Sequence, residues 1–261
     1  MRRILLLALV LAAPLWFMVA QDGSAAALSQ RTVDLLDSRP ARSILIVGNS
    51  RTYYNDMPAM IREIADSAGS PAKFQIETSA RPGYYFKHHW AFGRTRHLLA
   101  AGWDDIILQG ASAEQWNDEI QGDFFTYGAK LAAIARVNNG RPRLVVNWAY
   151  DPAEYQGDAE GYRELHLERI KAAHARLASE ANLARINLAG LWESVRHSHP
   201  SIRLTSDGNH PTMAGSYLYA LAIYANLAND RVANVAYVPD GLNPDDAKAL
   251  REAVDAYPLL G

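Results

Sequence analysis

The sequence predicts an α/β protein in which a doubly wound parallel sheet is covered by helices on both faces. Short apolar runs of β-forming residues alternate along the chain with longer segments whose apolar residues repeat at helical spacing. Several of these runs are apolar at consecutive positions, as in strands that are buried on both faces of a parallel sheet. We therefore expect a three-layer α/β/α sandwich with five strands.

Five segments carry strand patterns. In the first, the four consecutive apolar residues Ile44–Val47 are followed by Gly48. The second alternates in polarity and ends before a Pro-Gly turn signal at Pro82. The predicted strands are Ser43–Val47, Lys73–Ser79, Ile106–Gln109, Leu144–Trp148 and Ala184–Leu188.

The helix that starts near Met57 has the clearest boundaries. Asp56 can cap it, Pro58 suits its first turn, and its apolar residues repeat at helical spacing as far as Gly69. The other helices are expected between Lys87 and Ala101, within Phe124–Val137, over residues 159–181, at Leu191–Val195, from Thr212 to Leu227 and from Pro244 to Tyr257. Because no repeat or low-complexity segment interrupts this alternation, we predict one domain over residues 43–261.

Residues 1–27 have the composition of a secretory signal. A basic start precedes the apolar run Ile4–Ala20, and small residues up to Ala27 offer a cleavage site. The alternative is an uncleaved anchor, although the run is short for a membrane span and contains Pro14. We expect export to the periplasm or the extracellular space, with residues 28–42 as a linker.

Composition excludes several classes of function. The chain has no cysteine, so disulfides, thiol nucleophiles and thiolate zinc sites are excluded. Its formal net charge of −2 argues against a nucleic-acid partner. Neighbouring histidines at His88 and His89, and the pair His166 and His174, lack the further ligands that a metal needs, so we expect no metal and no cofactor.

Ser50 follows the first predicted strand in the segment Gly48-Asn49-Ser50. The carboxyl edge of an open parallel sheet is where ligands bind, so this hydroxyl is a candidate nucleophile. A strand followed by glycine and a small polar residue is also an ordinary connection to a helix. The stretch alone does not separate the two interpretations.

A second candidate group is the loop Asp207-Gly208-Asn209-His210-Pro211, which precedes a predicted helix. A carboxylate three residues before a histidine can bind imidazole Nδ1 and leave Nε2 free, as a general base requires. The alternative is ordinary helix punctuation, in which the Asx residues form turns and His210 is exposed.

Together, the two segments resemble the SGNH hydrolases, also called GDSL-type esterases, in motif, chain order and separation. The resemblance covers the whole domain and is to an atypical bacterial branch with Gly-Asn-Ser and Leu-Gln in these places. It implies a flavodoxin-like sandwich with Ser50 as nucleophile, His210 as base and Asp207 as its partner. It also implies an oxyanion hole built from the amides of Ser50 and Gly83 and the carboxamide of Gln109, where the family has asparagine.

Several aromatic residues follow predicted strand ends on the expected Ser50 side. Aromatic faces can stack on a sugar ring, and core packing is the alternative for each of them. The candidates for substrate binding are Trp148, Tyr150, Tyr84 and Tyr53.

The sequence thus predicts an exported serine esterase that hydrolyses short acyl esters, such as acetyl esters, on a carbohydrate. Its partner would be a small-molecule or glycan ester, with membrane contact only through an uncleaved N-terminus. Two alternatives stay open: a non-hydrolytic glycan-binding or envelope-assembly module on the same fold, and an acyltransferase that uses the same triad.

Overall fold

The computed structural model describes residues 37–150 and 159–259. The chain divides into two compact units, Met1–Pro40 and Ala41–Gly261. The predicted signal peptide or anchor at 1–27, and the predicted linker as far as residue 36, lie outside the described residues.

This unit is built on a single sheet of five parallel strands in the order β2-β1-β3-β4-β5. The predicted α/β class and the flavodoxin-like strand order are confirmed. The strands are β1 (Ala41–Gly48), β2 (Lys73–Ala80), β3 (Asp105–Leu108), β4 (Arg141–Val145) and β5 (Ala184–Ile186).

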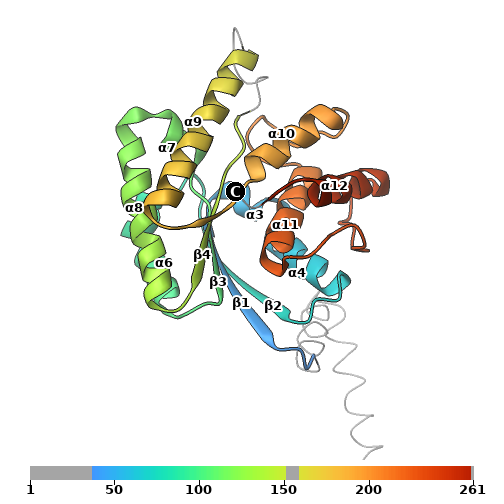
Figure 1. Cartoon of the computed structure of the whole chain (residues 1–261), viewed down its shortest axis with the longest axis horizontal. Helices are drawn as coiled ribbons and strands as arrows, with labels where there is room; N and C mark the ends of the chain where they lie inside the picture. The colour runs from blue at the N-terminus through green and yellow to red at the C-terminus, as the bar shows by residue number, and fades with distance from the viewer. Residues whose placement is uncertain (1–36, 151–158, 260–261) are drawn as a thin grey trace, which may run out of the picture. The chain divides into compact units, whose positions relative to one another are not determined.

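Helices cover both faces of the sheet, as Figure 1 shows. One layer contains α4 (Met57–Ser67), α10 (Leu188–Ser198), α11 (Met213–Ala228) and α12 (Pro244–Ala256), and the other contains α5 (Phe86–Ala91), α6 (Gly93–Ala100), α7 (Ser112–Trp116), α8 (Asp118–Val137) and α9 (Ala159–Glu180). The alternation of β1 explains the two layers. Ile44 and Ile46 belong to the core under α4 and α11, whereas Leu45 and Val47 belong to the core under α8 and α9.

The structure corrects several of the predicted elements. The segment predicted as one helix between Lys87 and Ala101 is two helices, because Phe92 between them has an extended backbone. The helix predicted from Phe124 begins six residues earlier, where Asn117 accepts the Glu119 N–H and caps it. The short helix α7 was not predicted.

The most buried helix, α11, follows the His210 loop directly. Thr212 caps it by accepting the Gly215 N–H at 3.2 Å. Gly215 is required here because a Cβ at this position would lie 2.2 Å from the Leu204 carbonyl oxygen. Among the described residues no helix combines the length and apolarity needed to cross a membrane.

The amino-terminal edge of the sheet holds a buried ion cluster. Asp105 at the start of β3 is fully buried and accepts hydrogen bonds from Arg42, Arg141 and Arg143. Burial raises the pKa of the Asp105 carboxyl, but the three guanidinium groups together lower it by more. The net shift of this pKa is therefore downward. The cluster therefore ties the starts of β1, β3 and β4 together.

Candidate active site

Ser50 lies at the carboxyl end of β1, in the first turn of α3 (Ser50–Tyr53). In the sheet, β2 lies on one side of β1 and β3 on the other, so the order in which strands are added reverses at β1. Such a switch point is where ligands bind in open α/β sheets. Gly48 permits this turn, because a Cβ there would lie 2.1 Å from Thr52 Oγ1 and 2.7 Å from Gln109 Oε1.

The structure brings the three predicted triad residues together. His210 Nε2 is 3.0 Å from Ser50 Oγ, and His210 Nδ1 is 2.6 Å from Asp207 Oδ2. Asp207 Oδ1 also accepts the backbone N–H groups of Asn209 and His210, at 3.0 and 2.6 Å. This loop orients the imidazole with Nδ1 toward the carboxylate and leaves Nε2 to accept the Ser50 proton.

Hydrogen bonding sets the charge of Asp207. Burial by itself raises the pKa of this carboxyl, but the His210 side chain and the N–H groups of His210 and Asn209 lower it to about 2. The carboxylate is therefore ionised throughout the pH range in which a histidine acts as a base.

Tyr54 packs on the face of the His210 ring. The two ring centroids are 4.4 Å apart, and the planes differ by 12°. The next residue, Asn55, has a left-handed backbone (φ 54°), and its Nδ2 donates to the Pro211 carbonyl at 3.0 Å and to Ser216 Oγ at 2.9 Å. A strained segment thus joins the Ser50 helix to the His210 loop. The sequence places Tyr54 among the aromatic residues near Ser50, but it does not predict the contact with His210, because nothing local links two residues so far apart in the chain.

Gly83 lies in the turn after β2, as predicted. Tyr84 N–H donates to the Arg81 carbonyl at 3.2 Å, and Gly83 has φ +65°, as at the third position of a type II turn. Within the described parts of the chain, neither Ser50 nor Gly83 donates a hydrogen bond from its backbone N–H. Two of the predicted oxyanion donors are therefore available to a ligand.

Gln109, the predicted third donor, is committed elsewhere. Its side chain is fully buried, and Oε1 accepts Asn49 N–H at 3.1 Å and Thr52 Oγ1–H at 2.8 Å. Its Nε2 donates to the neighbouring Gly110 carbonyl at 2.5 Å. The structure thus corrects this prediction: Gln109 joins the end of β3 to the Ser50 turn, and its amide group does not face the site.

Arg51 is a central residue of the site that sequence reasoning missed. Its guanidinium is buried, and Nε and Nη2 donate to Asn209 Oδ1 at 2.9 and 2.8 Å. Nη1 donates to Ser112 Oγ at 2.5 Å and to the Trp148 carbonyl at 2.9 Å. One side chain therefore connects the loops after β3 and β4 with the His210 loop.

Glu114 ties two further loops together. Its Oε1 accepts the Phe86 N–H at 3.2 Å and its Oε2 accepts the Ala111 N–H at 2.8 Å. The carboxyl is fully buried, and this burial raises its pKa to about 8 despite the two amide donors. The loop that follows Gly83 and the loop that starts α7 are thus held side by side.

A cavity of about 150 Å³ opens beside Ser50. The residues that line it are Asn49, Ser50, Arg51, Gly83, Tyr85, Ala111, Ser112, Ala113, Tyr150 and Asn209. Two predicted features, the nucleophile and the Gly83 amide, therefore share one cavity. Tyr150, a predicted substrate-binding residue, also lines it.

The other predicted substrate-binding aromatics lie outside this cavity. Trp148 is fully buried and stacks on Trp192, with ring centroids 4.1 Å apart, so it is a core residue and this prediction is corrected. The ring of Tyr84 packs edge-on against the His89 ring, with the ring centroids 5.2 Å apart. Tyr53 is 37% exposed on the surface next to Tyr54, where the prediction stays open.

No three potential metal-ligating side chains gather within residues 37–150 and 159–259. The histidines noted in the sequence have other contacts. His89 Nε2 bonds the Gly48 carbonyl at 2.8 Å, His166 Nε2 bonds the Ser112 carbonyl at 3.2 Å, and His174 Nδ1 bonds the Ile170 carbonyl at 2.7 Å. Burial lowers the pKa of each of these three imidazoles to about 4. They are neutral packing residues at neutral pH.

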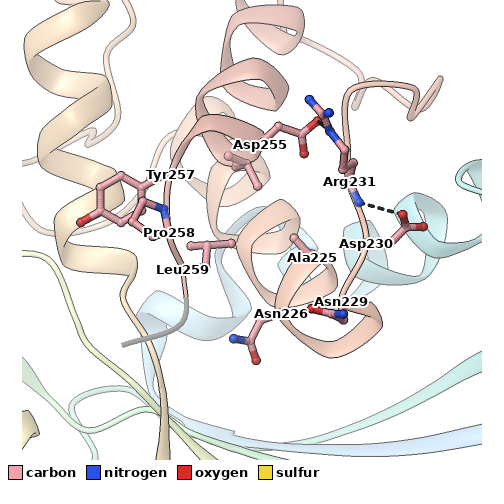
Figure 2. A pocket seen from close by; sticks show the side chains of 10 residues that line it. Ala225, Asn226, Asn229, Asp230, Arg231, Asp255, Tyr257, Pro258 and Leu259 are labelled. Carbon is pink, nitrogen blue, oxygen red and sulfur yellow. Dashed lines mark hydrogen bonds and ion pairs between the residues drawn. The ribbon is translucent and has the colours of Figure 1, made fainter.

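A larger cavity, of about 420 Å³, lies between the end of α11 and the end of α12 (Figure 2). Its main acidic group, Asp255, accepts the N–H groups of Val232 and Ala233 at 2.7 and 3.0 Å and pairs with Arg231. No hydroxyl–imidazole pair lies among the residues that line it. The chemistry of the molecule is therefore expected at the smaller cavity.

Comparison with known proteins supports the architecture. No family model matches the chain, and no curated protein sequence matches it. Among solved structures it is similar to a DUF4886 family protein from Bacteroides uniformis, with TM-score 0.68 and 18% identity over 83% of this chain and 94% of that one. It is also similar to a protein from Slackia heliotrinireducens described as an SGNH hydrolase, with TM-score 0.59 and 24% identity over 72% of this chain and 99% of that one.

A third similar structure is a variant of an acetyl xylan esterase from Geobacillus stearothermophilus, with TM-score 0.57 and 14% identity over 77% of this chain and 98% of that one. At these identities the likeness establishes the fold. The chain has the fold of the SGNH hydrolases, as the two sequence segments indicated.

Proposed function

We propose that this protein is an exported serine esterase that removes acetyl or another short acyl group from a carbohydrate. The observation that carries the proposal is the alignment of Ser50 Oγ, His210 and the Asp207 carboxylate, with distances of 3.0 and 2.6 Å. The same three groups in this order are the machinery of acyl transfer.

The reaction proceeds in two steps. Ser50 Oγ attacks the ester carbonyl while His210 Nε2 takes its proton, and the resulting imidazolium is stabilised by Asp207. The negative charge on the carbonyl oxygen is met by the N–H groups of Ser50 and Gly83, which donate to no other group in the part of the chain that the structure describes. His210 then gives its proton to the leaving alcohol, and water releases the acid from the acyl-enzyme by the reverse sequence.

The size of the cavity supports a short acyl group. At about 150 Å³ it is smaller than the pockets that enclose drug-sized ligands, which are roughly 300–1,000 Å³. Tyr85 and Tyr150 lie at its wall and offer aromatic faces to a sugar ring. The acetyl xylan esterase among the similar structures fits this choice of substrate class.

Export is proposed from the sequence of residues 1–27, which has the parts of a secretory signal and could also remain as an anchor. Transfer of the acyl group to a sugar hydroxyl uses the same site and differs only in the acceptor. The acyltransferase is therefore an outcome of the test below.

A fluorophosphonate probe tests the proposal directly. Folded protein should be labelled at Ser50 and should hydrolyse p-nitrophenyl acetate faster than longer acyl esters, and the Ser50→Ala variant should do neither. Labelling with slow hydrolysis that speeds up when a sugar acceptor is added would identify an acyltransferase. Absence of both labelling and hydrolysis would favour the non-hydrolytic module.

A further inference from the structure

The proposed oxyanion hole lacks a side-chain donor once Gln109 is excluded. Two backbone N–H groups, of Ser50 and Gly83, remain available at the cavity. Because each donor to a developing oxyanion contributes substantially to turnover, a third donor in the cavity wall would matter for the reaction. The inference below rests on the proposed esterase function and deepens it.

Ser112 occupies the appropriate place in the fold. It is the first residue of α7, three residues after Gln109, and it follows β3. Gly83 follows β2, and β2 and β3 are the two neighbours of β1, which carries Ser50. Gly83 and Ser112 therefore approach the nucleophile from its two flanking strands, and both line the same cavity.

The Ser112 hydroxyl has its oxygen fixed and its proton available. Its Oγ accepts from Arg51 Nη1 at 2.5 Å. Among the described residues its proton is donated to the Trp148 carbonyl at 3.3 Å, which is longer than the ordinary 2.5–3.0 Å of an O–H···O bond. That carbonyl already receives Arg51 Nη1 at 2.9 Å, so a carbonyl oxygen in the cavity would be a better acceptor for the hydroxyl.

The two asparagines that line the cavity come from other parts of the fold. Asn49 directly precedes the nucleophile, and its Nδ2 donates one of its two N–H groups to the Tyr84 carbonyl at 3.3 Å. Asn209 has its carboxamide oxygen fixed by two N–H groups of Arg51, and it belongs to the loop that carries the base. Ser112 is the side chain in this set that comes from the strand next to Ser50.

The segment around Ser112 is held rigidly, as an oxyanion donor requires. The Ser112 carbonyl contacts His166 Nε2 at 3.2 Å, and the residue is 2% exposed. The preceding N–H, of Ala111, is held by Glu114, which also holds Phe86 on the Gly83 side. The positions of both flanks of the proposed hole are therefore fixed relative to each other.

We propose that the Ser112 hydroxyl is the third oxyanion donor and that Arg51, by donating to Ser112 Oγ, orients and polarises it. When Ser50 Oγ bonds to the carbonyl carbon, the π electron pair moves to the carbonyl oxygen and the Ser50 proton moves to His210 Nε2. Ser112 donates a hydrogen bond to the new oxyanion and keeps its proton. The bond strengthens as charge develops, so it lowers the barrier without tightening substrate binding.

The Ser112→Ala variant tests this assignment. Its kcat on p-nitrophenyl acetate should fall about 10²-fold with KM nearly unchanged, since one oxyanion donor is typically worth 10²–10³-fold. Its fluorophosphonate labelling rate should fall in parallel, because the phosphonyl oxygen occupies the same hole. An unchanged kcat, or a change confined to KM, would overturn the proposal.

Two further variants separate catalysis from folding. Ser79→Ala is the matched control, because Ser79 is also buried at the end of a strand and its hydroxyl bonds Thr95 Oγ1 at 2.7 Å, outside the cavity. The Ser79→Ala variant should unfold at a lower urea concentration than the wild type and keep kcat within about twofold. Ser112→Cys, which keeps the shape with a weaker donor, covers the case in which the alanine variant does not fold. Its kcat should still fall at least about tenfold, and full activity would contradict the assignment.

The same measurements distinguish failure of the inference from failure of the proposed function. Wild-type protein that is neither labelled nor hydrolytic would refute the esterase itself. Wild-type protein that is active, together with an equally active Ser112→Ala variant, would refute only the role of Ser112.

Discussion

The two ends of β3 carry buried polar clusters of opposite character. At the amino end, the Asp105 carboxylate is surrounded by three arginines, and its oxygens are occupied. At the carboxyl end, Gln109 bonds the Ser50 turn, yet the N–H groups of Ser50 and Gly83 donate to no described residue. The carboxylate of the first cluster has all its partners within the protein, whereas the second cluster includes two donors on residues that line a cavity.

This difference explains why chemistry is expected at one edge alone. Ser50 is partly buried and Gly83 is exposed, so water can satisfy their N–H groups until a ligand beside the nucleophile replaces it. The ion cluster instead contributes to folding, because its charged groups already have partners. Variants at the two edges should consequently separate into effects on turnover and effects on stability.

The largest expected effect is on turnover at the carboxyl edge. Ser50→Ala and His210→Ala should each lower kcat by at least about 10⁴-fold, and combining them should add little, because the residues act as a unit. Measured kcat values on p-nitrophenyl acetate for the two single variants and the double variant check this. A double variant far below either single variant would mean that the two side chains act independently.

A smaller effect, on stability, is expected at the amino edge. Asp105→Ala leaves three arginines without their buried carboxylate and should lower the unfolding free energy by about 3 kcal/mol. This loss lies at the low end of the range for breaking a buried ion pair because the Arg141 side chain is 58% exposed. Urea unfolding measures the loss, and kcat of the folded variant should be unchanged. The exposed pair Lys248–Glu252 supplies the control, since Glu252→Gln should leave the unfolding free energy nearly unchanged.

Gln109 should show a mixed effect, and Gln115 is its natural control. Gln109→Met leaves the Asn49 N–H and the Thr52 hydroxyl without their acceptor, so about 1–3 kcal/mol of stability should be lost. Turnover should fall as well, because Asn49 precedes the nucleophile. Gln115 is equally buried, but its carboxamide has no partner among the described residues, so Gln115→Met should be nearly neutral in both unfolding and kcat. Equal effects of the two substitutions would show that the Gln109 bonds do not position Ser50.

The triad geometry was predictable because its signals are local. Gly48-Asn49-Ser50 follows a buried strand, and Asp207 and His210 are three residues apart in one loop. The spacing within that loop brings carboxylate and imidazole together without help from the rest of the chain. The resemblance of the two segments to the SGNH hydrolases then placed them on one edge of the sheet.

The misassigned residues share a different property. Gln109 and Trp148 both stand at strand ends, where the sequence indicates proximity to the site but not the direction of the side chain. Which of Gln109 and Ser112 faces the cavity depends on how the chain turns after β3 into α7. The contacts of Arg51 with Asn209 and of Tyr54 with His210 could not be predicted, because these partners are far away in the sequence.

By itself, the sequence determined the alternation of strands and helices, the position of Ser50 at a strand end and the Asp207–His210 pair. These depend on periodicity and on spacings of a few residues, which any segment carries within itself. Tertiary structure alone decided which polar groups are hydrogen-bonded within the protein and which remain for a ligand. The hydrogen bonds of Gln109 and Arg51 join residues roughly 60 to 160 positions apart, and such partners meet only when the sheet has formed.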